Sequence, residues 1–228
     1  MRSSTSLFGS LLFLLAALTT LPFESTTICD DPGATGATVD IVAKSNSSPR
    51  AIFNGQDIAL AYYDRGRLEF ASYDFNGNIT GGPTDITAIS GSPVIEWNGN
   101  GYGTFYILNN DTTGHWELWF WRLLPDGTPV NFARRITPLA ADVNSAGRVQ
   151  VVWNGSVFGV VWQDERVTDD RIYYTAVNAN GTVAVNEVLL SDPSDDHQKP
   201  ALLWDGNHFV VAWHSRSNTW ARVRIGSR

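Results

Sequence analysis

Short apolar runs separated by glycine-containing turns recur along most of this chain. Four times an apolar run ends in an aromatic residue followed by Asn-Gly or Asp-Gly, and a second aromatic comes nine residues after the first. These dipeptides supply the positive φ angles of tight hairpin turns, so each copy predicts two antiparallel strands. The leading aromatics are Phe53, Trp97, Trp153 and Trp204, and the second aromatics are Tyr62, Tyr106, Trp162 and Trp213.

Each copy continues into further strands. Third strands are expected at residues 68–73, 118–123, 172–177 and 220–225, and three of them end at another Asn-Gly or Asp-Gly turn. More polar fourth strands end near Ile86, Ile136 and Leu190. Four antiparallel strands in about 50 residues, with the inner strands most apolar, are typical of a propeller blade. The sequence therefore predicts an all-β fold, a four-bladed β-propeller.

The two ends of the repeat region predict how such a ring closes. The fourth copy reaches Arg228 directly after its third strand, and residues 36–45 (GATVDIVAKS) match the outer-strand segment 181–191 (GTVAVNEVLLS). We expect the N-terminal strand to complete the last blade, because this removes exposed sheet edges. Two alternatives are an open stack of four sheets and a fragment that pairs with a second chain.

The N-terminal region has the pattern of an export signal. Arg2 precedes an apolar run at residues 7–21, which is shorter than the roughly 20 residues of a membrane span. We expect a signal peptide at 1–27, a short linker at 28–35 and the propeller at 36–228. The mature chain is then secreted or at the cell surface, without a transmembrane segment. A retained N-terminal anchor is the alternative.

Cysteine content and charge exclude further classes of protein. Cys29 is the only cysteine, so an intramolecular disulfide is excluded. A lipid anchor at Cys29 is an alternative that the preceding Thr-Thr-Ile disfavours. The net charge of −7 and the lack of a Lys/Arg cluster argue against a nucleic-acid partner. No zinc, EF-hand, P-loop or serine-hydrolase motif occurs in the sequence, so we expect no cofactor, with Ca²⁺ as the one alternative.

Acidic residues concentrate in two connections of the third copy. In a propeller these connections share one face, and Ca²⁺ prefers several carboxylate and carbonyl oxygens. The predicted metal or basic-ligand site consists of Asp164, Asp169, Asp170, Asp195 and Asp196. The alternative is a solvated acidic rim without a ligand.

Two other groups of residues have both a functional and a structural interpretation. Asp64 and Asp164 each follow the second aromatic by two residues. They can be interpreted as the catalytic carboxylates of a glycosidase or as residues that cap a turn by accepting backbone hydrogen bonds. Their recurrence favours the cap. Trp119 and Trp121 are two residues apart and are therefore expected on one face of a strand, beside Glu117. They can be interpreted as an aromatic platform that binds a sugar or as residues that pack between two sheets. Packing is favoured there.

The segment WNGSVFGVVWQDERVTDDRIYYTAVNANGTV, residues 153–183, resembles the repeat of bacterial secreted and cell-surface propeller-like proteins. That repeat reads W-[ND]-G-x5-VVW-x-D-x-R…Y-x-x-x-V-x-x-[ND]-G-T. The resemblance implies a propeller blade and export, but no single activity. Four blades also resemble the hemopexin-like fold, whose blade motif is absent from this sequence. Haem or matrix-protein binding is therefore not carried over.

The primary functional hypothesis is a non-catalytic, monomeric, secreted binding scaffold. Its ligand would be an extracellular glycan, a surface polymer or a protein, held on the loop face of the propeller. One alternative is an extracellular glycoside hydrolase, which would need a pair of carboxylates in a shared site. Another is a structural or adhesive module without a small ligand.

Overall fold

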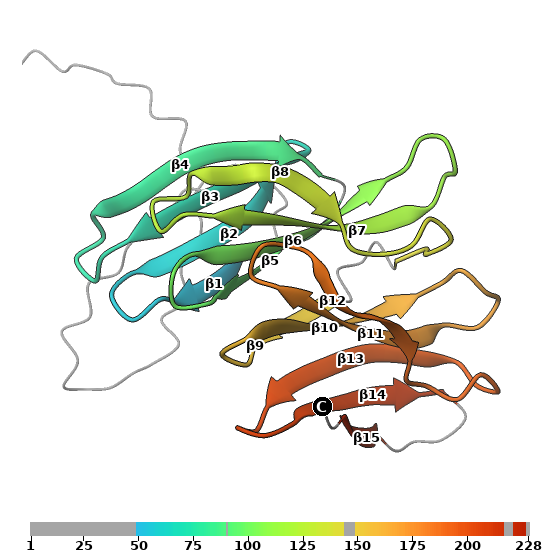
Figure 1. The fold of residues 1–228 in the computed structure, drawn as a ribbon. Helices are drawn as coiled ribbons and strands as arrows, with labels where there is room; N and C mark the ends of the chain where they lie inside the picture. The colour runs from blue at the N-terminus through green and yellow to red at the C-terminus, as the bar shows by residue number, and fades with distance from the viewer. Residues whose placement is uncertain (1–48, 90, 144–148, 217–220, 227–228) are drawn as a thin grey trace, which may run out of the picture.

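All regular structure in the described part of the chain is β (Figure 1). The computed structural model describes residues 49–89, 91–143, 149–216 and 221–226, the last range for the backbone only. The strands are β1 (Arg50–Phe53), β2 (Ile58–Asp64), β3 (Arg67–Tyr73), β4 (Ile79–Ala88), β5 (Val94–Trp97), β6 (Tyr102–Asn109), β7 (Trp116–Leu123), β8 (Pro129–Arg135), β9 (Val149–Trp153), β10 (Val157–Asp164), β11 (Arg171–Asn178), β12 (Val183–Leu189), β13 (His197–Trp204), β14 (Phe209–Ser215) and β15 (Ala221–Gly226).

These strands form four antiparallel sheets of neighbours in sequence. The first sheet is β1–β4, the second β5–β8, the third β9–β12, and the fourth contains β13–β15. The predicted turns are confirmed, because the glycines of the Asn-Gly and Asp-Gly dipeptides have positive φ, as at Gly155 (95°) and Gly181 (84°). β13 begins earlier than predicted and contains a bulge between Gln198 and Ala201.

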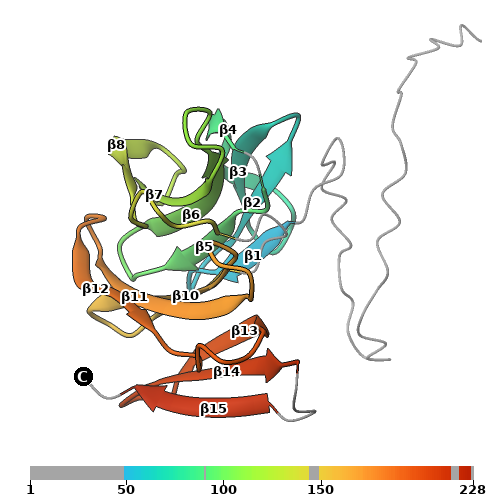
Figure 2. The same cartoon turned by 90° about the vertical axis from the view of Figure 1, so that its right-hand side faces the viewer.

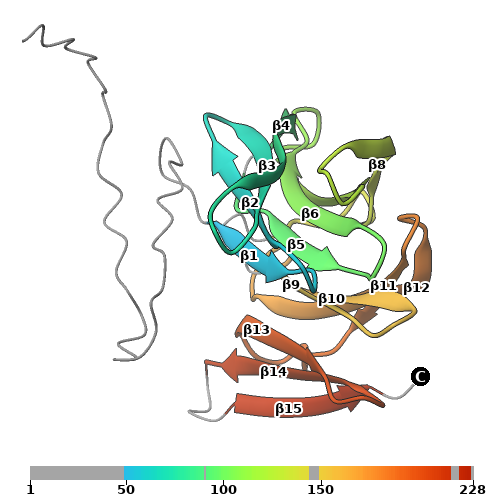
Figure 3. The same cartoon turned by 90° about the vertical axis from the view of Figure 1, so that its left-hand side faces the viewer.

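The sheets follow one another around an arc, with the blue-cyan first sheet and the red fourth sheet at its two ends (Figures 2 and 3). The first strands are innermost: β1 lies against β5, β5 against β9, and β9 against β13. Buried hydrophobic clusters join the first sheet to the second, the second to the third, and the third to the fourth. Within the described residues, no such cluster joins the fourth sheet to the first.

The closed ring therefore stays a prediction. The expected signal peptide (1–27), linker (28–35), Cys29 and closing strand (36–45) all lie outside the described residues. The part of the chain that is described contains no helix long and apolar enough to span a bilayer.

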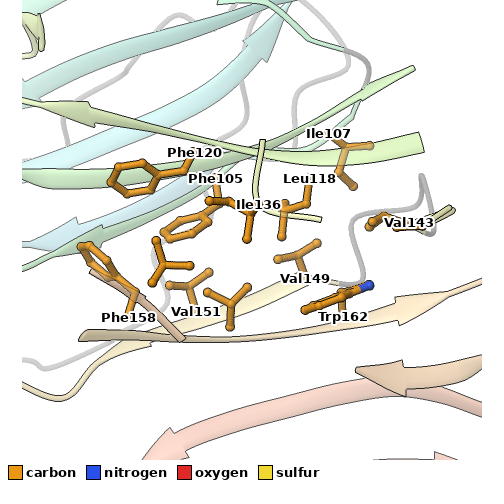
Figure 4. Close-up of a cluster of buried hydrophobic side chains, with 13 residues drawn as sticks. Phe105, Ile107, Leu118, Phe120, Ile136, Val143, Val149, Val151, Phe158 and Trp162 are labelled. Carbon is orange, nitrogen blue, oxygen red and sulfur yellow. The ribbon is translucent and has the colours of Figure 1, made fainter. Parts of the chain in front are cut away.

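Aromatic rings of one sheet lie on glycines of the sheet that precedes it in sequence. A Cβ on Gly103 would be 2.7 Å from the ring of Phe158, and a Cβ on Gly159 would be 2.4 Å from the ring of Phe209. Figure 4 shows Phe105 and Phe120 of the second sheet facing Phe158 of the third, with centroids 5.5 and 5.8 Å from that of Phe158. Glycine is required at these positions because any side chain would displace a packed ring.

The leading aromatics are less buried than their recurrence suggests. Phe53 is 52% exposed, and the three leading tryptophans are half-buried against the first aromatic of the following strand, as in the Trp153–Phe158 pair. Three of the second aromatics, Tyr106, Trp162 and Trp213, are almost fully buried. The leading positions thus lie at the rim of each inter-sheet core, and the second aromatics lie inside it.

Candidate functional site

The two acidic connections of the third sheet lie side by side. Residues 165–170 join β10 to β11, and residues 190–196 join β12 to β13. The backbone N–H of Asp170 donates to Asp196 Oδ1 (3.0 Å), and the N–H of His197 donates to the carbonyl of Asp170 (3.0 Å). We call this pair of connections the acidic corner. It belongs to the loop face, the end of the sheets where the second strand connects to the third.

Asp170 and Asp196 share one amide group. The side-chain nitrogen of Gln198 donates to Asp170 (2.8 Å) and to Asp196 (3.2 Å), and Gln163 donates a second bond to Asp170 (2.8 Å). Partial burial, together with the charge of Asp196, raises the pKa of Asp170. Arg216 reaches Asp196 at 3.1 Å and offsets part of the negative charge.

Asp164 is fully buried and holds its own loop in place. Both of its oxygens accept from the Arg166 guanidinium, at 2.6 and 2.7 Å, and one also accepts the indole N–H of Trp162 at 3.0 Å. Arg166 continues to Glu187 on β12 (2.9 Å) and stacks 4.3 Å from the ring centroid of Tyr173. A bidentate, buried pair of this kind fixes geometry. The structure thus favours the structural interpretation of Asp164, with Asp64 at the matching end of β2.

The other two predicted ligands lie around a buried cation. Asp169 is 54% exposed and 3.5 Å from Arg171, while Asp195 accepts a hydrogen bond from the Ser215 hydroxyl. The Arg171 guanidinium lies beneath them and donates to the backbone carbonyls of Pro193 and Asp195. No group of three His, Cys, Asp or Glu side chains in the described residues could hold a metal ion. The Ca²⁺ site stays a prediction.

The same corner recurs between the second and third sheets. Asp142 Oδ1 accepts the N–H of Trp116, and the Asp142 carbonyl accepts the N–H of Glu165. Asp196 makes the matching bonds, with the N–H groups of Asp170 and Arg216. An aspartate at this position therefore joins the third strand of one sheet to the second strand of the next. Sequence reasoning missed Asp142, which precedes the start of β9 by seven residues, whereas Asp196 lies directly before β13.

The tryptophans of β7 serve packing. Trp119 donates its indole N–H to Glu117 (3.2 Å), and Trp121 donates to the carbonyl of Asn131 (3.2 Å). Both rings are half-buried against the core between the first and second sheets. Glu117, only 3% exposed, also accepts from Asn110 (2.8 Å) and Arg135 (3.2 Å). This arrangement favours the packing interpretation over a sugar platform.

Outward-pointing groups surround the buried polar network of the acidic corner. Lys199 is exposed at the bulge of β13 with φ of +54°, and its N–H donates to the buried Gln163 (3.1 Å). The Arg216 side chain is 76% exposed and that of Asp169 54%. Val167 adds an apolar side chain, 48% exposed. A rigid, mixed polar and apolar surface of this kind suits binding.

Comparisons with known proteins give little further information. No protein-family model matches the chain, and no curated protein matches its sequence. Among solved structures, the chain is similar to an endo-arabinase from Bacteroides thetaiotaomicron VPI-5482. The identity is 16% and the TM-score 0.47, over 79% of this chain and 74% of that one. A likeness at this level says nothing about activity.

Replacing Asp170 by Asn tests the electrostatics of the acidic corner. The raised pKa means that folding favours the protonated form, so this stabilising contribution is present at low pH and is lost as pH rises through the folded-state pKa. Asp170→Asn should therefore raise the melting temperature at pH 7 relative to the parent, and the difference should shrink near pH 4. The exposed Asp169→Asn is the matched control, with a smaller effect. A lower melting temperature for Asp170→Asn at pH 7 would contradict the burial argument.

Proposed function

We propose that this chain is a non-catalytic binding module, exported to the cell exterior, that holds an extracellular glycan, surface polymer or protein on its loop face. The observation that carries the proposal is that carboxylates at the loop face are hydrogen-bonded to other side chains of the protein. Asp164, Asp170 and Asp196 accept hydrogen bonds from Arg166, two glutamines and Arg216. Carboxylates held in this way fix the loops, so that the loops present a stable surface for a ligand.

The surface of the acidic corner offers both polar and apolar contacts. Lys199 and Arg216 extend donors outward, Asp169 offers acceptors, and Val167 offers an apolar patch. Saccharides need this combination, because their hydroxyls both donate and accept while their C–H faces lie on apolar atoms. The export part of the proposal rests on the signal pattern of residues 1–27.

One observation favours an extracellular glycoside hydrolase as the second candidate. Asp170 and Asp196 lie close enough to share the Gln198 amide, and partial burial raises the pKa of Asp170. A carboxyl with a raised pKa beside a second carboxyl group is the arrangement of a general acid and its companion. In this reading Asp170 would protonate the leaving-group oxygen.

Glycan-array binding and a reducing-end assay on the same polysaccharides separate the two candidates. For the binding module, the mature chain retains a glycan without releasing sugar ends, and Lys199→Ala with Arg216→Ala weakens binding about tenfold or more, the equivalent of about 1.4 kcal/mol. Phe132→Ala is the control, because Phe132 is 89% exposed on the outer strand β8. Sugar release that disappears in Asp170→Asn would establish the hydrolase instead. If the chain neither retains a glycan on the array nor releases reducing ends, both glycan proposals are contradicted.

We also infer that residues 36–45 form the fourth strand of the last sheet and so close a four-bladed ring. Two observations support this inference. β15 has no described partner on its outer side, whereas each other sheet has a fourth strand there. Residues 36–45 also share the alternation of the outer-strand segment 181–191.

Deletion of residues 28–45 tests the closure. Loss of the strand leaves an exposed sheet edge, so the truncated chain should aggregate or melt several degrees lower than the chain from residue 28. Thermal unfolding and light scattering measure both effects. A truncated chain that stays monomeric with an unchanged melting temperature would show that these residues are not part of the fold.

A further inference from the structure

Arg122 lies near the end of β7 and has no carboxylate partner among the residues that the structure describes. Its side chain is half-buried and lies on the side of the second sheet that faces the third, the same side as the buried Phe120 two residues earlier. Its Nε atom is buried and has no hydrogen-bond partner, and the guanidinium makes no ion pair with any described residue. Buried donors in folded proteins are almost always bonded, so this unpaired nitrogen needs an explanation, either an ordered water or a ligand that contacts the guanidinium.

The repeat itself does not need an arginine at this position. In the second sheet the row across the first three strands reads Glu96, Gly103, Arg122. The matching rows are apolar or small: Ile52, Ala59 and Ser72 in the first sheet, and Val152, Gly159 and Ala176 in the third. Charges that depart from a repeat at an inter-sheet position reduce stability, and such departures are expected at functional sites.

Glu96 does not neutralise Arg122, although both lie on the same side of the sheet. The ring of Phe158 rests on Gly103 between them, so close that a Cβ on Gly103 would be 2.7 Å from it. One Glu96 oxygen instead accepts the N–H of Trp153 (3.1 Å), and burial raises the pKa of the Glu96 carboxyl. Arg122 thus has no carboxylate partner among the described residues, and it lies beside the turn at residues 98–101, at the end of the sheets opposite the loop face.

We propose that Arg122 binds a small oxoanion, the carboxylate of a uronic acid or a sulfate ester, carried by a glycan. The planar guanidinium presents paired N–H donors that match two oxygens of such a group. Arg134 lies on the same side of the sheet, with its aliphatic stem beside Gly181, and makes no ion pair among the described residues. A second guanidinium without an ion pair on this side of the sheet adds to the local positive potential, which favours an anion despite the net charge of −7. This site is separate from the loop face and does not rest on the function proposed there.

Calorimetric titration of the mature chain tests the proposal with three probes: sodium glucuronate, glucose 6-sulfate and glucose. We expect saturable, salt-sensitive binding of at least one anionic probe and none of neutral glucose. The tighter of the two anions identifies the source as uronate or sulfate ester. Arg122→Gln should weaken binding at least tenfold, and Arg122→Lys should weaken it less, because lysine keeps the charge but loses the paired donors. Arg65→Gln is the control, on an arginine whose side chain is 73% exposed at the loop face.

A stability measurement guards against variants that fail to fold. Arg122→Met replaces an unsatisfied cation by an apolar side chain of similar length, so it should raise the melting temperature without ligand and abolish the response to the anions. Absence of binding by both anionic probes would overturn the proposal. Unchanged binding in Arg122→Gln or Arg122→Met would overturn it as well.

Discussion

The structure depends on one kind of contact, in which an aromatic ring of one sheet lies on a glycine of the sheet that precedes it in sequence. Phe158 lies on Gly103 and Phe209 on Gly159, so the second strands of neighbouring sheets approach without an intervening side chain. The turns contribute in the other direction, since a Cβ on Gly181 would be 2.5 Å from the ring of Phe120. The glycine of an Asn-Gly dipeptide thus has two roles where a neighbouring ring reaches it: positive φ and room for that ring.

This packing determines where ligand chemistry can occur. Because the rings fix the spacing of the sheets, the connections at the loop face meet in the same way twice, once through Asp142 and once through Asp196. The carboxylates that look catalytic in the sequence are mostly bound to protein donors that hold these connections. At the opposite end, Arg122 has no such partner among the described residues.

The strands and turns could be predicted from sequence because their signals are local. An Asn-Gly between two apolar runs specifies a hairpin without reference to the rest of the chain, and β1, β5 and β9 end at the leading aromatics Phe53, Trp97 and Trp153 as the pattern indicates. The depth of each aromatic could not be predicted in this way. Both Trp162 and Trp153 pack on the core between the second and third sheets, but Trp162 is buried inside it and Trp153 is half-buried at its rim, a depth that depends on how the two sheets pack together.

The same distinction between local signals and contacts formed by packing applies to the candidate sites. The proximity of the two acidic connections followed from the order of strands alone. The pair of Asp164 with Arg166 joins residues two positions apart, so the Asp-x-Arg spacing of the third copy could have indicated it. The cap made by Asp142 and the isolation of Arg122 depend instead on contacts between residues brought together by sheet packing. No spacing in the sequence encodes these two features directly, although the Glu96–Gly103–Arg122 row could have been noticed as a departure from the repeat.

The packing of rings on glycines is tested most directly by comparing two alanine substitutions in matched turns. Gly155 and Gly181 both follow Asn and have φ of 95° and 84°, but a Cβ at Gly155 would have nothing within 4 Å. Urea unfolding should show that Gly155→Ala costs roughly 1 kcal/mol of backbone strain. Gly181→Ala should cost about 1–3 kcal/mol more, because the methyl group displaces Phe120. Phe120→Leu should relieve part of that extra cost in the double variant. Equal costs for the two alanines would contradict the account.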